Sequence, residues 1–161
     1  MDRYEKHIAG LAAVGLDIDE RTLLGSRLSG LYISKRGLKP TICINPALSS
    51  KEKICVIAEE AGHHYRTFGN VISLATVRER KGERAGRTWA YMNLLPLDDI
   101  AQAWLGGVNT IWDLAEHLEV TEQFLMDAID YYHQRFGEIK ELENGVIVQF
   151  DPYFDAYSAD E

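Results

Sequence analysis

Two carboxylates and two imidazoles recur at helical spacing within one short segment of the chain. Glu59 lies four positions before His63, and Glu60 lies four positions before His64. Positions four apart on an α-helix differ by only about 40° in direction, so each Glu–His pair projects together. Carboxylate and imidazole groups gathered in this way are able to bind a divalent metal ion.

The helix that would carry these pairs is apolar on most of its other sides. Its residues Ile54, Ile57, Ala58 and Ala61 indicate a buried helix. Burying charged groups costs several kcal/mol each unless they are paired or bind a cation, and a metal ion would offset that cost. The spacing alone leaves a second interpretation open, in which the Glu–His pairs are ordinary neighbours on a half-exposed helix.

Residues 59–63 differ at one position from the zinc-binding signature H-E-x-x-H. In that signature, two side chains four positions apart bind zinc, and the Glu between them activates water for attack on a peptide bond. Glu59 stands where the first histidine of the signature would stand.

A further carboxylate lies on a second long helix, which we expect over residues 73–94 and which ends before Pro96. Glu83 shares a face of this helix with Gly86 and Ala90, and two such small residues let another helix approach closely. The other interpretation is an exposed Glu83 held among arginines by surface ion pairs, which contribute little to stability.

Local signals also predict the surrounding elements. Ser49 and Glu52 form a capping box that opens the motif helix, expected over residues 50–66. An amphipathic first helix ends at Gly15, and further helices are expected at 97–105, 111–118 and 122–136. Strands are expected at 31–34 and 41–45, and Asn144-Gly145 predicts a two-residue hairpin turn between arms at 139–143 and 146–150. A tail from residue 151 is expected to be loose at its end. The fold class is therefore α+β, mainly helical with a small sheet.

Composition and charge exclude several classes of protein. The chain has 161 residues, 46% of them apolar, and a formal charge of −8. This acidity argues against general binding to nucleic acid or to an anionic membrane surface. Residues 8–16 are too few to span a bilayer, and Cys43 and Cys55 are expected to be buried and reduced. We expect a cytoplasmic protein.

Residues 53–65 resemble the ImmA/IrrE family of zinc metallopeptidases, most closely its short versions from phages and mobile elements. The resemblance extends to the pattern Glu83-x-x-Gly86-x-x-Trp89-Ala90-x-x-x-Leu94-x-Pro96, and it covers roughly residues 30–137. It implies a zincin-like metallopeptidase domain over residues 1–96, followed by a helical module with the C-terminal hairpin and tail over residues 97–161, packed as one compact unit.

The same resemblance implies a gluzincin-like site. Glu59, His63 and Glu83 take the positions of the metal ligands, and Glu60 takes that of the general base. The implied cofactor is zinc, with manganese or iron as alternatives because Glu59 makes the ligand set harder and more negative. A metal site that uses His64 and Glu60 as ligands is less favoured, because Glu60 would then bind the metal and could not act as the general base.

Three side chains near these residues are candidates for contacting the metal ligands from outside or for stabilising the oxyanion of the reaction. They are His64, Tyr65 and Tyr91. An extended substrate is expected to add to the sheet along residues 41–45. Glu60 would take a proton from the attacking water and pass it to the leaving amine.

The implied partner is a helix-turn-helix transcriptional repressor, which the family's members cleave or inactivate as anti-repressors or in a stress response. The alternative is a catalytically weak or metal-free protein that binds the repressor without cleaving it. Residues 110–125 themselves resemble a helix-turn-helix, but residues 97–137 carry eight acidic residues against the single base Arg135. Such a segment would repel phosphates, so we expect no direct contact with nucleic acid. The sequence leaves the oligomeric state open.

Overall fold

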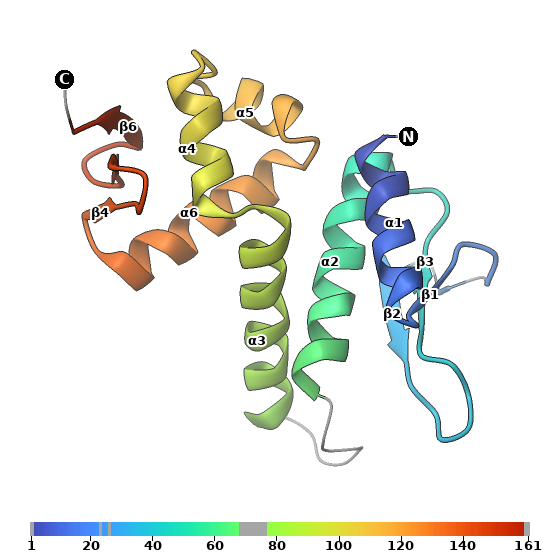
Figure 1. The fold of residues 1–161 in the computed structure, drawn as a ribbon. Coiled ribbons are helices and arrows are strands. Elements are labelled where there is room, and N and C mark those ends of the chain that lie inside the picture. Colours follow the sequence, from blue (N-terminus) through green and yellow to red (C-terminus); the bar gives the residue numbers. More distant parts are fainter. Residues whose placement is uncertain (1, 23, 26, 68–76, 160–161) are drawn as a thin grey trace. The chain divides into compact units, whose positions relative to one another are not determined.

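The computed structural model describes residues 2–22, 24–25, 27–67 and 77–159, without the side chains of residues 66–67 and 77–83. Within these bounds the chain is mainly helical and forms two compact units, Met1–Ala90 and Tyr91–Glu161 (Figure 1). In the described ranges no helix is long and apolar enough to cross a membrane.

The first unit is built around α2 (Ser50–Thr67), which starts where the capping box predicted. The Ser49 N–H donates to Glu52 Oε2 at 2.8 Å, and the Glu52 N–H donates to Ser49 Oγ at 3.3 Å. The helix α1 (Arg3–Ala13) carries its own capping box, formed by Asp2 and Glu5. The last helix of this unit is α3 (Val77–Leu94), which continues past the boundary between the two units. The helix was predicted to begin at residue 73, and residues 73–76 lie outside the described residues.

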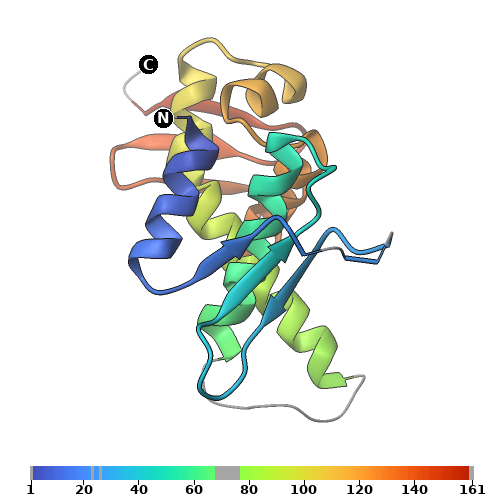
Figure 2. The ribbon, with the colours of Figure 1, turned by 90° about the vertical axis from the view of Figure 1, so that its right-hand side faces the viewer.

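A three-stranded sheet in the order β1-β3-β2 completes the first unit (Figure 2). Its central strand β3 (Thr41–Ile44) pairs in parallel with β1 (Asp17–Asp19) and antiparallel with β2 (Gly30–Ile33). The prediction that an extended substrate adds to the sheet along residues 41–45 was therefore wrong. Both sides of β3 are paired, and β2 is an edge of the described sheet.

Apolar side chains from α1, α2 and β3 form the core of the first unit. They are Leu11, Ile42, Ile44, Ile57 and Ala61, together with Leu16 from the turn between α1 and β1, and all six are buried. Both cysteines are buried and free, as predicted. This core fixes α2 against the sheet and so determines which of its polar side chains meet β2.

The second unit combines three helices with a second sheet. Its helices are α4 (Leu97–Leu105), α5 (Ile111–His117) and α6 (Glu122–Phe136), close to the predicted ranges. The second sheet has the order β4-β5-β6, with β4 (Ile139–Glu141), β5 (Val146–Gln149) and β6 (Asp155–Ser158). Fully buried side chains from these elements include Ile100, Leu114, Leu125 and Val148.

One local expectation in this unit, the two-residue hairpin turn, was wrong. The Leu142 N–H donates to the Val146 carbonyl at 2.8 Å, so the hairpin loop has three residues instead of two. Gly145 ends that loop with φ +79°, the left-handed conformation that such loops require. The tail contains β6, which was not predicted and which pairs with β5, and the end of the tail that was predicted to be loose, residues 160–161, lies outside the described residues.

Candidate metal centre

The two Glu–His pairs lie on the central part of α2 and are largely shielded from solvent. Glu59, Glu60 and His63 are half-buried, and His64 is 8% exposed. Their neighbours on the helix, Ile57 and Ala61, are fully buried. The apolar positions of the helix are therefore buried as predicted, while of the four charged or polar groups only His64 is buried.

The second pair, Glu60 and His64, meets the edge strand β2 through one residue. The Tyr32 N–H donates to Glu60 Oε2 at 3.0 Å, and the Tyr32 hydroxyl lies 2.7 Å from His64 Nδ1. The rings of Tyr32 and His64 pack edge to face, with centroids 5.4 Å apart. Both polar groups of this pair are thus held at the sheet.

The first pair, Glu59 and His63, lies toward α3. A Cβ atom added to Gly86 of α3 would lie 3.1 Å from Nδ1 and Cε1 of the His63 ring and 3.4 Å from the Glu59 carbonyl oxygen. A Cβ atom added to Gly62 would lie 2.8 Å from the Cα and carbonyl carbon of Gly86. Cβ atoms essentially never come within 3.0 Å of an atom of a distant residue, so the absence of a side chain at Gly62 allows α2 and α3 to lie this close, and a Cβ atom at Gly86 would crowd the His63 ring.

Glu83 belongs to α3, three positions before Gly86, and its side chain lies outside the described residues. Positions three apart share a helix face, so residue 83 is on the face that Gly86 turns toward His63. Among the side chains that are described, no three of His, Cys, Asp and Glu come together as a metal site. A metal site with Glu59, His63 and Glu83 as its ligands therefore stays a prediction, and carboxylate and imidazole groups are ligand types that suit a first-row divalent ion.

Burial and local contacts set the protonation of the pair that meets β2. Burial raises the pKa of Glu60, while the charge of His63 and the hydrogen bond from the Tyr32 N–H oppose the rise. Burial also lowers the pKa of His64, which favours the neutral imidazole. A carboxylate with a raised pKa is a better proton acceptor near neutral pH.

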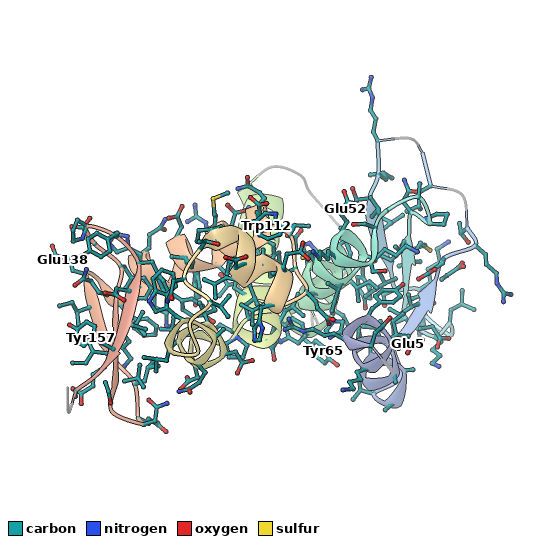
Figure 3. All side chains as sticks on the ribbon, turned by 90° about the horizontal axis from the view of Figure 1, so that it is seen from above. Glu5, Glu52, Tyr65, Trp112, Glu138 and Tyr157 are labelled. Atoms are coloured by element: carbon teal, nitrogen blue, oxygen red, sulfur yellow. The ribbon has the colours of Figure 1, made fainter. Side chains whose placement is uncertain are left out.

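The other two predicted residues, Tyr65 and Tyr91, belong to different units of the chain. Tyr65 is 39% exposed and stacks on Trp89 of α3 at 4.8 Å between ring centroids (Figure 3). Tyr91 is buried in the second unit, where its ring packs against Phe124 at 5.2 Å and Tyr131 at 5.7 Å.

Sequence reasoning missed Tyr32 and Gly30 as parts of this site. Tyr32 acts on Glu60 through its backbone N–H, a group that every residue except proline carries, so no side-chain pattern marks it. Gly30 faces α2, where an added Cβ atom would lie 2.5 Å from Val56 Cγ1 and 3.3 Å from Glu60 Cγ. The signal available was a glycine directly before the predicted strand at 31–34, since a glycine in a strand often marks a close approach of another element.

A comparison with protein families finds a match. The family model of M78 peptidases, described as the IrrE N-terminal-like domain, matches residues 12–130. The chain belongs to this family. No curated protein and no solved structure matches the chain. The family is one of metallopeptidases, so membership supports a hydrolase with a metal cofactor, and the matched residues include all of α2 and α3.

Proposed function

We propose that the chain is a metal-dependent endopeptidase in which Glu59, His63 and Glu83 hold the metal ion and Glu60 is the general base. The observation that carries this proposal is the division of the two pairs on α2. His63 lies against α3 at Gly86, while Glu60 lies against β2 at Tyr32. The proposed ligand His63 and the proposed base Glu60 thus contact different neighbouring elements, although the charge of His63 still acts on the Glu60 carboxylate.

Zinc is the proposed metal. Zinc is bound in proteins by histidine nitrogen and by carboxylate oxygen, and catalytic sites use three protein ligands. With two carboxylates among the ligands, the set is harder than one with two histidines, so manganese and iron are competitors. The site would therefore discriminate between these metals less strongly than one with two histidines.

The residues of the chain supply the proton transfers of peptide hydrolysis. A bound divalent ion would polarise the scissile carbonyl and acidify water. Glu60 accepts a proton from the attacking water as the new C–O bond forms, and it then donates that proton to the nitrogen of the breaking C–N bond. The products are a carboxylate and an amine, and Glu60 returns to its ionised state.

We propose that an extended segment of the substrate adds to the open edge of β2. This position replaces the one predicted along residues 41–45, which are paired on both sides. Strand addition uses main-chain hydrogen bonds, which any extended peptide can form. Because β2 carries Tyr32 and lies against Glu60, a peptide on this edge runs past the base.

The proposed substrate or partner is a helix-turn-helix repressor. The second unit carries fifteen Asp and Glu against two Lys and Arg, which suits a basic, DNA-binding partner. In that unit Trp112 on α5 is 60% exposed beside the exposed Asp113 (Figure 3). An exposed tryptophan is a frequent anchor of protein interfaces.

A second candidate function is repressor binding without cleavage. The observation that favours it is Glu59, a carboxylate at the first ligand position, which adds negative charge to the site and reduces the acidity that a metal ion gives to water.

The deciding experiment mixes the purified chain with a helix-turn-helix repressor, chosen from the genes that neighbour its own. Wild type is compared with Glu60→Gln and with Glu138→Gln, an exposed control in the second unit. The peptidase proposal predicts cleavage by wild type and by the control, abolished by a chelator. It predicts no cleavage by Glu60→Gln even though that variant keeps its metal. Stable binding of the repressor by all three proteins without any cleavage would instead establish the binding function.

A further inference from the structure

The edge strand β2 has a defined set of outward-facing main-chain groups. The Asn45 N–H donates to the Ser29 carbonyl at 2.9 Å, so Ser29 belongs to a hydrogen-bonded pair with β3. Hydrogen-bonded and non-hydrogen-bonded pairs alternate along an antiparallel ladder. Leu31 therefore bonds to β3, and the N–H of Tyr32, which is paired in register with Ile42, points away from β3 toward the open edge.

This outward N–H is occupied by the carboxylate that we assign as the general base. The Tyr32 N–H donates to Glu60 Oε2 at 3.0 Å. Gly30 makes the approach possible, because the side chain of Glu60 passes the position where a Cβ atom of residue 30 would lie, only 3.3 Å from Glu60 Cγ. The carboxylate oxygen thus occupies the position that a carbonyl oxygen of an added strand would take.

We propose that Glu60 occupies a substrate-binding position on the Tyr32 N–H in the free protein, and that an extended peptide must displace it to bind. Displacement transfers the Tyr32 N–H to a carbonyl oxygen of the peptide and releases the carboxylate. The catalytic consequence rests on the proposed function, since the released carboxylate is then available as the base. The occupied N–H itself is independent of catalysis.

The strand is held in place while the carboxylate is exchanged. The Tyr32 hydroxyl is 2.7 Å from Nδ1 of His64, whose side chain is buried, and the Tyr32 ring packs against the core of the first unit. These contacts fix β2 to α2 independently of Glu60. The binding position selects an extended backbone and not a particular side chain, because its donor is a main-chain N–H.

The first test measures amide hydrogen exchange in wild type, Glu60→Ala and Glu60→Gln. In Glu60→Ala the Tyr32 amide loses its acceptor, and we expect its exchange to accelerate about tenfold or more. In Glu60→Gln the side-chain carbonyl replaces the carboxylate as acceptor, and exchange should stay close to that of wild type. The amides of Leu31 and Ile33, which are bonded to β3 by the same alternation, are internal controls and should not change. Equal exchange of the Tyr32 amide in all three proteins would overturn the proposal.

The second test measures the affinity of the two variants for an unfolded polypeptide, the oxidised insulin B chain. Both variants lack the base, so binding is measured without turnover. Glu60→Ala leaves the N–H free and should bind this probe about tenfold more tightly than Glu60→Gln, a difference of one competing hydrogen bond. Equal affinities, or weaker binding by Glu60→Ala, would overturn the proposal.

The two tests separate this inference from the proposed function. If wild type cleaves no protein but the exchange and affinity differences appear as expected, the peptidase function is wrong. The proposal that a peptide displaces Glu60 from the Tyr32 N–H is then still supported. If wild type cleaves its substrate while both differences are absent, the displacement fails and the peptidase function stands.

Discussion

Replacing Gly62 by alanine tests the close approach of α2 and α3 on which the candidate site depends. The added Cβ atom would lie 2.8 Å from the Cα and the carbonyl carbon of Gly86, and closer still to its carbonyl oxygen. These are backbone atoms of a helix and cannot rotate out of the way. The two helices must therefore separate at this point.

The size of the effect follows from two opposing contributions to the free energy of unfolding. Alanine is better than glycine in a helix interior by about 1 kcal/mol. Forcing an extra carbon atom into a packed contact costs about 1–3 kcal/mol. Because the added atom meets several backbone atoms at once, the cost lies at the upper end of this range. We expect Gly62→Ala to lower the free energy of unfolding by about 2 kcal/mol.

The assay is urea denaturation followed by circular dichroism, with Gly10→Ala as the matched control. Gly10 is an exposed residue of α1, and a Cβ atom added there would meet no atom within 4 Å. Gly10→Ala should therefore raise the free energy of unfolding by about 0.5–1 kcal/mol. The two substitutions are chemically identical and should have opposite signs. A Gly62→Ala protein as stable as wild type or more stable would refute the packing of α2 on α3.

Three further substitutions test the two units separately. Burial lowers the pKa of His7 below its usual 6.5, so the unfolded chain binds the proton more readily and stability falls as the pH drops below that value. His7→Phe should reduce this fall in urea midpoints measured from about pH 8 to about pH 5, and an unchanged fall would contradict the assignment. Trp104→Phe removes the 2.8 Å bond to Asp155 and should lower the free energy of unfolding by about 1–2 kcal/mol, with faster amide exchange in β6. Tyr132→Phe removes the 2.8 Å hydrogen bond to the Leu95 carbonyl and should lower the free energy of unfolding by about 1 kcal/mol. An unchanged urea midpoint in Trp104→Phe or in Tyr132→Phe would contradict the stabilising role of the hydrogen bond that this variant lacks.

Elements defined by local signals were predictable from the sequence. The capping box of Ser49 and Glu52 fixes the start of α2, and the side chains of Thr110 and Thr121 cap α5 and α6. These hydrogen bonds join residues three positions apart, so they can be inferred from a short stretch of sequence.

Elements defined by distant partners were not predictable in this way. The strand β1 has three residues, two of them aspartates, and it exists because it pairs with β3 more than twenty positions later. Without β1 in view, β3 looks like an edge strand, and the substrate was expected there. The strand β6 was missed for the same reason, since its pairing with β5 and the bond between Trp104 and Asp155 stabilise it.

The candidate site divides in the same manner. The pairing of Glu59 with His63 and of Glu60 with His64 follows from helix periodicity, which the sequence contains. The sequence does not show which pair faces α3 and which faces β2. That depends on the glycines at 30, 62 and 86, each of which allows atoms of another element to come close. The hydrogen bond from the Tyr32 N–H to Glu60 arises only after β2 has packed against α2.

The central claim is that the pair facing α3 holds a metal ion, and it is tested most directly by the metal content of histidine variants. Wild type, His63→Ala and His64→Gln are purified without chelators, dialysed against zinc and then against metal-free buffer, and assayed by elemental analysis. We predict about one zinc ion per chain in wild type and in His64→Gln, and almost none in His63→Ala. Full zinc content in His63→Ala, or its loss only in His64→Gln, would contradict the assignment of Glu59, His63 and Glu83 as the ligands.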